Sequence, residues 1–269
     1  MKYESLKGLR LPKIGFGTWN IGGGSRPRPG RDADDTRALR SALDLGYSHF
    51  DTSEIYAAGH TEELLGRALR ESGIDRARLF LATKVAPGHL DYRRILEACE
   101  DSLRRLSTDY VDLYLIHWPS PRMDLGRAFE AMNRLVRDGK VRHLGVSNFG
   151  LKLLQESVRR SEYGILTDQV PYSIHDRSYV KNGVLAYCQN HGVLLTAYSP
   201  FEQGKLRQSE RLAAVAATHA ATPFQIALAW LCSQFHVITI PMSTDPSHQR
   251  QNLAASEITL GPEELLQLS

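Results

Sequence analysis

Short apolar runs alternate with longer amphipathic segments along nearly the whole chain. The apolar runs predict eight strands, at 13–18, 47–51, 79–84, 110–117, 141–147, 165–169, 193–199 and 237–241. The intervening segments have the period of an α-helix and predict helices at 34–46, 61–73, 92–106, 127–139, 151–160 and 183–192. Strands that alternate with helices in this way indicate βαβ units and a parallel sheet.

Helix boundaries can be predicted for two of these segments. The first helix places Thr36, Leu39 and Leu43 largely on one side and stops at Gly46. In the second helix, we expect Thr61 to be the N-cap residue. Acidic residues follow Thr61 near the positive end of the helix dipole, and a glycine at position 73 ends the segment.

The number of units predicts the fold class. Eight βα units in a chain of 269 residues fit an α/β fold, a (β/α)8 TIM barrel, formed as a single domain over residues 1–269. A doubly wound open sheet is the alternative, but it usually carries a glycine-rich phosphate turn after its first strand. The segment "GFGTWNIGGG" lacks the third glycine of that motif at the required place, and Trp19 would obstruct a tight turn. We therefore interpret residues 20–31 as a flexible loop, and a phosphate-binding role for Gly22–Gly24 is the less favoured reading.

Composition excludes several other classes of protein. Lys and Arg total 33 and Asp and Glu total 30, and the two signs are interspersed, so neither nucleic acid nor an anionic membrane is an expected partner. The cysteines, Cys99, Cys188 and Cys232, are isolated, which disfavours a disulfide framework and a CxxC metal or redox site. The first residues lack the apolar core of a signal peptide. These observations lead us to expect a cytoplasmic protein.

Polar side chains follow six of the predicted strands. In chain order they are Asp51, with Tyr56 in the next loop, then Lys84, His117, Ser147, Asn148, Gln169, Tyr198 and Ser199. Taken singly, each has a plain structural explanation, such as a helix cap, a strand end that turns to solvent, or a hydrogen-bonded core histidine. In a barrel, however, the carboxyl ends of all strands meet at the face that carries active sites. We therefore expect the first four of these groups to converge.

A carboxylate, an ammonium, a phenol and an imidazole together suit the reduction of a carbonyl group. A phenol has an ordinary pKa of about 10, which is too high for an efficient acid near neutrality. The ammonium of Lys84 would stabilise the phenolate of Tyr56 and lower that pKa, while Asp51 holds the ammonium in place. The imidazole of His117 would bind and polarise the carbonyl oxygen.

The remaining component of such a reaction is a hydride donor. The hydroxyl and amide groups of Ser147, Asn148 and Gln169 are suited to bind a carboxamide. Tyr198 is suited to stack on a flat ring.

With these residues in view, the chain resembles the aldo-keto reductases, in particular prokaryotic members with a short C-terminus. The resemblance covers essentially the whole chain and rests on "GFGTW", "FDTSEIY", "TKV", "DLYLIHWP", "GVSNF", "DQVPY", "AYSP" and "IPMSTDPSHQRQN", in this order. It implies that Asp51, Tyr56, Lys84 and His117 are the catalytic tetrad, with Tyr56 as proton donor, and that the cofactor is NADPH, with NADH possible. It further implies a substrate pocket lined by Trp19, Tyr56, His117 and Trp118.

The resemblance also implies a set of cofactor contacts. Ser147, Asn148 and Gln169 would hold the nicotinamide amide, and Tyr198 would stack on the ring. The other positions that contact cofactor in this family are Gly17, Thr18, Trp19, Asp51, Ser199, Pro200, Phe201, Ile240, Ser243, Thr244, His248, Gln251 and Asn252.

One segment departs from the family pattern. Many relatives that use NADPH carry a basic residue directly after the Ile-Pro pair and an Arg one turn later, whereas this chain has Met242 and His248, with Asp245 between them. Ser243, Thr244 and the start of the following helix are still suited to bind an anion. We therefore expect NADPH to be used with a weakened preference over NADH.

The chain ends with "GPEELLQLS", where many relatives continue into a loop that closes over the substrate. This leads us to expect an open pocket with broad specificity, or a site that another chain completes. The expected partner is a small carbonyl substrate, and the expected state is a monomer or weak homo-oligomer. The alternatives are a regulatory, redox-sensing subunit with the same fold, and a barrel enzyme of another chemistry such as a lyase or isomerase. The intact tetrad disfavours the first, and the carboxamide-binding set disfavours the second.

Overall fold

Eight parallel strands form the central sheet of the computed structural model, which describes residues 1–206 and 209–268. Each strand overlaps one of the eight predicted ones. They are β3 (Phe16–Gly17), β4 (His49–Asp51), β5 (Phe80–Val85), β6 (Val111–Ile116), β7 (Val141–Ser147), β8 (Thr167–Pro171), β9 (Leu194–Tyr198) and β10 (Val237–Thr239). Neighbours in the sheet are neighbours in the sequence, and every pair is parallel.

The first and last strands of this sheet also meet. Ile14 forms a parallel bridge with Thr239. The N–H of Gly15 donates to the Thr239 carbonyl at 2.8 Å, and the N–H of Thr239 donates to the Lys13 carbonyl at 2.8 Å. The sheet therefore closes on itself, and the predicted (β/α)8 barrel is confirmed.

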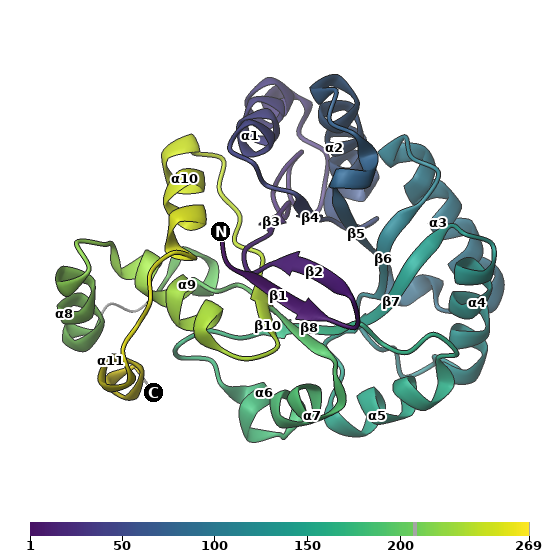
Figure 1. Ribbon diagram of the computed structural model, residues 1–269. Helices are drawn as coiled ribbons and strands as arrows, with labels where there is room; N and C mark the ends of the chain where they lie inside the picture. Colours follow the sequence, from purple (N-terminus) through teal and green to yellow (C-terminus); the bar gives the residue numbers. More distant parts are fainter. Residues whose placement is uncertain (207–208, 269) are drawn as a thin grey trace.

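Helices surround the barrel (Figure 1). Their bounds are α1 (Asp32–Asp44), α2 (His60–Ser72), α3 (Tyr92–Leu106), α4 (Leu125–Arg137), α5 (Leu151–Arg160), α6 (Ser178–Lys181), α7 (Val184–His191), α8 (Glu210–Thr218), α9 (Pro223–Ser233), α10 (Pro246–Ala255) and α11 (Pro262–Gln267). The six predicted helices correspond to α1 to α5 and α7.

The predicted N-cap of α2 is wrong. The helix begins at His60, and its N-cap is Gly59, which has a left-handed conformation with φ of 92°. The Thr61 hydroxyl does not cap the helix but donates to the Ile21 carbonyl at 2.6 Å. The predicted end of this helix is confirmed, because Gly73 is its left-handed C-cap.

An antiparallel hairpin that the sequence pattern did not reveal covers one end of the barrel. Its strands are β1 (Tyr3–Leu6) and β2 (Leu9–Pro12), and it lies across the middle of the view in Figure 1. Leu11 of the hairpin packs into the barrel interior with Phe80, Leu113 and Ile238. The hairpin thus closes the amino-terminal end, and the opposite end remains for the site.

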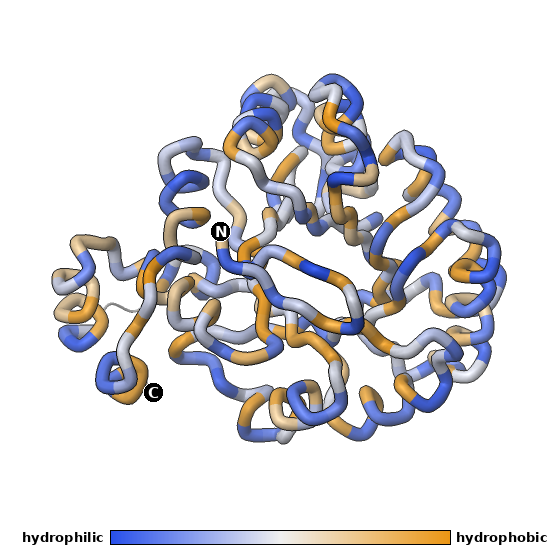
Figure 2. The backbone as a smooth tube through the Cα atoms, viewed as in Figure 1, coloured by the Kyte–Doolittle hydropathy of each residue, from blue (hydrophilic) through white to orange (hydrophobic). Residues whose placement is uncertain are grey.

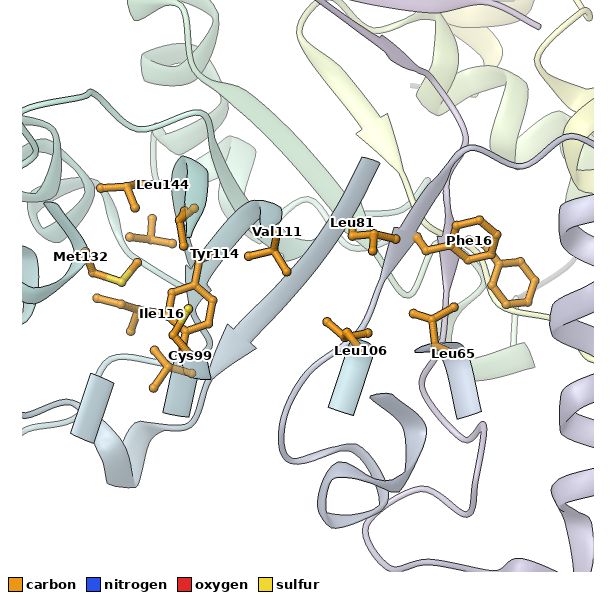
Figure 3. Packing of buried hydrophobic residues seen from close by; sticks show 14 of the residues in the cluster. Phe16, Leu65, Leu81, Cys99, Leu106, Val111, Tyr114, Ile116, Met132 and Leu144 are labelled. Carbon is orange, nitrogen blue, oxygen red and sulfur yellow. The ribbon is translucent and has the colours of Figure 1, made fainter. Parts of the chain in front are cut away.

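Alternate residues of each strand face two different cores. Figure 2 shows apolar residues recurring along the strands and on successive turns of the surrounding helices. Residues that point outward from the barrel, such as Leu81 and Ile116, pack against helix residues such as Leu65, Cys99 and Met132 (Figure 3). Residues at the intervening positions fill the barrel.

The loop at 20–31, which we interpreted as flexible, makes defined contacts with its neighbours. The Arg28 N–H donates to the Gly22 carbonyl at 2.7 Å, and the Ala57 N–H donates to the Gly24 carbonyl. The Gly22 N–H donates to the buried carboxylate of Asp35 at 2.8 Å. Because the Gly22 N–H is already bound to the Asp35 carboxylate, this contact gives no support to a phosphate-binding role for Gly22–Gly24.

Within the described residues, no single helix is both long and apolar enough to cross a membrane. One bent pair, α8 with α9, passes that test by length and composition only.

Candidate active site

Three of the predicted tetrad residues lie at the mouth of the barrel, because side chains alternate between the two faces along each strand. Ala82 and Leu115 belong to the core inside the barrel. Lys84 and His117 lie two positions further along the same strands, so they also face inward, near the carboxyl ends. Asp51 ends β4 beside them, because its register partner on β5 is Ala82.

Lys84 is the centre of the arrangement. Its side chain is fully buried, and Nζ lies 2.5 Å from Oδ1 of Asp51, 2.7 Å from the Thr52 carbonyl oxygen and 3.4 Å from the hydroxyl oxygen of Tyr56. The second carboxylate oxygen of Asp51 accepts from Nε2 of Gln169 at 2.8 Å. Both oxygens of this buried carboxylate therefore have donors.

The tyrosine is presented by an unusual turn. Tyr56 begins a short 3-10 segment, η2 (Tyr56–Gly59), in which Ala57 and Ala58 have φ values of 47° and 53°. Its N–H donates to the Ser53 carbonyl at 3.1 Å. Left-handed backbone at two consecutive alanines is costly, and such strain tends to occur at functional sites. The turn directs the phenol back over the end of β5 and toward Lys84.

Burial and charge set the protonation states of this pair. Burial raises the pKa of Tyr56, and the Lys84 ammonium offsets only part of that rise. The ammonium thus lowers this pKa as expected, but desolvation has the larger effect, so the net shift is upward. For Lys84, burial lowers the pKa, but the charge of Asp51 and the phenol of Tyr56 raise it by a larger amount. The net shift of the Lys84 pKa is therefore upward. Near neutrality, Lys84 is charged and Tyr56 keeps its proton.

His117 lies beside the tyrosine. The two rings meet edge to face with centroids 5.6 Å apart, and the indole of Trp118 stacks on the imidazole at 3.9 Å. Nδ1 of His117 lies 2.8 Å from Oγ of Ser53. Burial and the nearby Lys84 lower the pKa of His117 to about 2, so the imidazole is neutral at physiological pH.

The residues predicted to bind a carboxamide form one hydrogen-bonded group at the ends of β7, β8 and β9. The Ser147 hydroxyl donates to the Gln169 carbonyl at 2.7 Å. Nδ2 of Asn148 donates to the His117 carbonyl and to Oγ of Ser147, each at 3.0 Å, and Oδ1 accepts from the Tyr198 hydroxyl at 2.8 Å. Asn148 adopts a left-handed conformation with φ of 63°. Through Gln169, this group is connected directly to Asp51.

The other predicted cofactor contacts lie at or after the ends of β3, β9 and β10. Gly17 ends β3 at the closure of the barrel, and a Cβ atom there would lie 2.6 Å from the Ile240 carbonyl oxygen. Thr18 is buried, and its hydroxyl donates to the Asp51 carbonyl at 2.9 Å. Ser199, Pro200 and Phe201 follow β9, while Ser243, Thr244, His248, Gln251 and Asn252 lie after β10 and in α10.

The segment after β10 carries its own anionic group. Asp245 is the N-cap of α10, and its Oδ1 accepts from the N–H groups of Ser247 at 2.7 Å and His248 at 3.3 Å. These hydrogen bonds lower the pKa of Asp245. Met242 is half-buried against the core, and His248 is exposed. At the start of α10, Pro246 has no N–H, and the N–H groups of Ser247 and His248 are already bound to the Asp245 carboxylate instead of being free for another anion.

Two indoles stand at the rim of the site. Trp19 is 44 % exposed and meets the Tyr56 ring edge to face at 5.0 Å, and Trp118 is 39 % exposed. Both indoles are far more exposed than the phenol and the imidazole that they contact.

Two further groups lie in this site that were not predicted from the sequence. The Thr52 carbonyl accepts from Lys84, and the Ser53 hydroxyl contacts His117. Ser53 lies beyond the end of β4, so the two-residue period of the strand gave no signal for its contact with His117.

Comparisons with known proteins show the family of this chain. The model of the Aldo/keto reductase family matches residues 13–269. "Methylglyoxal reductase YeaE" of Escherichia coli K12 is 37 % identical over 266 residues, which are 97 % of this chain and 90 % of that protein. The crystal structure of a thermostable aldo-keto reductase, Tm1743, with the inhibitor epalrestat superposes with a TM-score of 0.96 at 44 % identity, covering 100 % of this chain and 98 % of the other. An aldo/keto reductase from Klebsiella pneumoniae, solved with NADP and acetate, gives a TM-score of 0.89 at 37 % identity, covering 99 % and 94 %.

Proposed function

The chain belongs to the aldo/keto reductase family and is a nicotinamide-dependent oxidoreductase of carbonyl groups, and we propose that it reduces small dicarbonyl aldehydes of the methylglyoxal type with NADPH. The observation that carries the proposal is the position of Lys84, whose Nζ contacts both the Asp51 carboxylate and the Tyr56 hydroxyl beside the His117 ring. A single domain over residues 1–269 would hold the whole site.

Each member of the tetrad has a distinct role in this proposal. Tyr56 gives its proton to the oxygen of the substrate as the carbonyl becomes an alcohol. Lys84 stabilises the phenolate that remains, and Asp51 keeps the ammonium oriented toward the phenol. The neutral imidazole of His117 donates a hydrogen bond to the same oxygen and fixes its direction.

The donor set at the ends of β7 and β8 fits a nicotinamide carboxamide. Hydroxyl and amide groups of Ser147, Asn148 and Gln169 lie side by side there, and the phenol ring of Tyr198 is tethered to Asn148. These residues would hold the amide and stack on the ring. When bound, the dihydronicotinamide supplies the hydride that reduces the carbonyl carbon. Ser243, Thr244, Gln251 and Asn252 would contact the adenosine end.

The substrate class is proposed from the rim and from the relatives. Trp19 and Trp118 are exposed on either side of Tyr56 and His117, which suits a small carbonyl compound that needs few further contacts. The name of the Escherichia coli relative supports methylglyoxal as the first compound to assay. The three cysteines are buried free thiols, which is compatible with the proposed cytoplasmic location, as a monomer or weak homo-oligomer.

Steady-state kinetics over a panel of carbonyl compounds test the proposal. The panel contains methylglyoxal, glyoxal, an aromatic aldehyde and an aliphatic ketone, each assayed with NADPH and with NADH. We expect the dicarbonyl aldehydes to have the highest kcat/KM. Tyr56→Phe should lose most of this activity. Tyr163→Phe is its control, because Tyr163 is an exposed tyrosine outside the site and its loss should leave the activity unchanged. Cofactor binding without turnover of any carbonyl would instead support the regulatory alternative.

A further inference from the structure

Ser53 connects the end of β4 to the catalytic imidazole. Its side chain is fully buried, and Oγ lies 2.8 Å from Nδ1 of His117. Two weaker contacts surround the same oxygen. The Ile55 N–H donates to Oγ at 3.4 Å, and the Lys84 carbonyl oxygen lies 3.4 Å from it. The contact with His117 is the shortest of the three by a clear margin.

A neutral imidazole has one proton and two nitrogens, and the position of that proton decides what the ring can do. With the proton on Nε2, His117 can donate a hydrogen bond to a carbonyl oxygen. With the proton on Nδ1, Nε2 would present a lone pair to the lone pairs of that oxygen, which is repulsive. The ring orientation is already restricted, because Trp118 stacks on one face and the ring lies edge to face with Tyr56.

We propose that Ser53 is a positioning residue, which donates its hydroxyl proton to Nδ1 of His117 and so keeps the imidazole proton on Nε2. The surroundings of Oγ favour this direction. The Ile55 N–H supplies Oγ with a donor, which leaves the hydroxyl proton free for an acceptor. The other available acceptor, the Lys84 carbonyl, is 0.6 Å more distant and already accepts from the Glu54 N–H at 3.4 Å.

The consequence for catalysis rests on the proposed function. Ser53 does not touch the substrate, and no proton leaves His117 during reduction. The hydroxyl acts through the ring, because it fixes which nitrogen carries the hydrogen-bond donor. This is the same logic by which the second hydrogen bond of a functional histidine selects its tautomer.

The tautomer can be measured directly in the unmodified protein. Long-range 15N–1H correlation spectra of protein labelled at histidine report which ring nitrogen carries the proton, and the signals of His117 are identified by their loss in His117→Asn. We expect the proton on Nε2. In Ser53→Ala we expect a mixture of tautomers or the Nδ1 form, and Ser53→Thr, which retains a hydroxyl, should restore the Nε2 form. A proton on Nδ1 in the unmodified protein overturns the proposal, and that result does not depend on any variant.

Kinetics supply the second measurement. The single-turnover rate of Ser53→Ala with the preferred carbonyl substrate should fall roughly tenfold, while the Kd of the cofactor stays within about twofold. Ser157→Ala is the matched control, because Ser157 is equally buried and its hydroxyl bonds to the Leu153 carbonyl within α5. An unchanged rate and tautomer in Ser53→Ala would refute the role of Ser53. A wild-type protein that reduces no carbonyl refutes the proposed function instead, and the tautomer measurement still decides the case of Ser53.

Discussion

Replacing Lys84 by methionine tests both the stability and the chemistry of the site. Methionine fills a similar volume without charge. The ammonium is fully buried and contacts Asp51, which is 2 % exposed, so the variant leaves a buried carboxylate with Gln169 as its remaining side-chain donor. Breaking a buried ion pair from one side costs about 3–5 kcal/mol. For a chain of 269 residues this corresponds to a fall in Tm of roughly 5–9 °C.

The effect on activity follows from the distance between the lysine and the phenol. An ammonium and a phenolate 3.4 Å apart attract each other by about 5 kcal/mol at an effective dielectric constant of about 20. If about half of the phenolate charge has developed in the transition state, removal of the ammonium destabilises that state by about half of this energy. Proton release from Tyr56 should then be about 70-fold slower.

The pH dependence of Lys84→Met has a definite sign. The ammonium holds the pKa of Tyr56 below the value that burial alone would give, so its removal raises that pKa further. Reduction requires the protonated phenol, so the alkaline limb of kcat/KM for reduction should move to higher pH. Oxidation of the alcohol starts from the phenolate, so its rate should fall at any pH below that limb.

A matched control separates the two effects. Lys13 is also buried and pairs with Glu4, but it lies at the amino-terminal end of β10, where it donates to the carbonyls of Gln234 and Val237. Lys13→Met should lose a comparable amount of stability and keep the wild-type pH profile. Thermal melts and pH–rate profiles in both directions provide the measurements. A Lys84→Met protein with wild-type kcat/KM and an unmoved alkaline limb would refute the assignment of Lys84.

Three further predictions concern Tyr56, the segment after β10 and the buried carboxyl group of Asp168. Tyr56→Phe should lower kcat for carbonyl reduction by about 10²–10⁴-fold. The Kd of NADPH, measured by fluorescence quenching, should stay nearly unchanged. Substantial turnover by this variant would exclude Tyr56 as the proton donor. Met242→Lys should raise the ratio of kcat/KM for NADPH over NADH by roughly tenfold, whereas an unchanged ratio would show that this position does not face the 2′-phosphate. Burial raises the pKa of Asp168 well above its ordinary value, so the folded state favours the protonated form and the stability contribution of this group is lost as pH rises. Asp168→Asn should therefore be more stable than wild type at pH 8 in urea titrations and lose that advantage toward pH 4; a difference independent of pH would contradict a raised pKa.

The short apolar runs predicted the barrel because most strand positions are buried on both faces of the sheet. All six positions of β5 and of β6 are buried, which gives the short apolar runs that bound each strand. The hairpin at residues 3–12 escaped detection because its strands are four residues long and mix charged with apolar positions. The helix at Pro223–Ser233 lacks a polar face, since seven of its eleven residues are buried, and so it has no amphipathic period to recognise.

The site was predictable to the extent that it depends on strand position. Asp51, Lys84 and His117 each lie at or just beyond the end of a strand, and a period of two places them inward. The contact of Ser53 with His117 joins positions 64 residues apart, and it depends on how the chain leaves β4. The N-cap of α2 was wrong for a related reason, because a turn of two left-handed alanines and a glycine brings the chain into the helix one residue earlier than Thr61. Contacts that depend on such backbone turns cannot be deduced from residue spacing.

Asp51 links the two halves of the site. Its Oδ1 holds the Lys84 ammonium, and its Oδ2 accepts from Gln169, which belongs to the group proposed to bind the carboxamide of the cofactor. A buried carboxylate with fixed donors on both oxygens cannot reorient as water would, so the ammonium beside it also stays in place while charge develops on Tyr56. Any displacement of the Gln169 side chain when the carboxamide binds would be transmitted to Lys84 through this one carboxylate. With the roles proposed for Gln169 and Tyr56, cofactor binding and proton delivery would share Asp51, and a carboxylate suits this position because its charge balances the buried ammonium of Lys84.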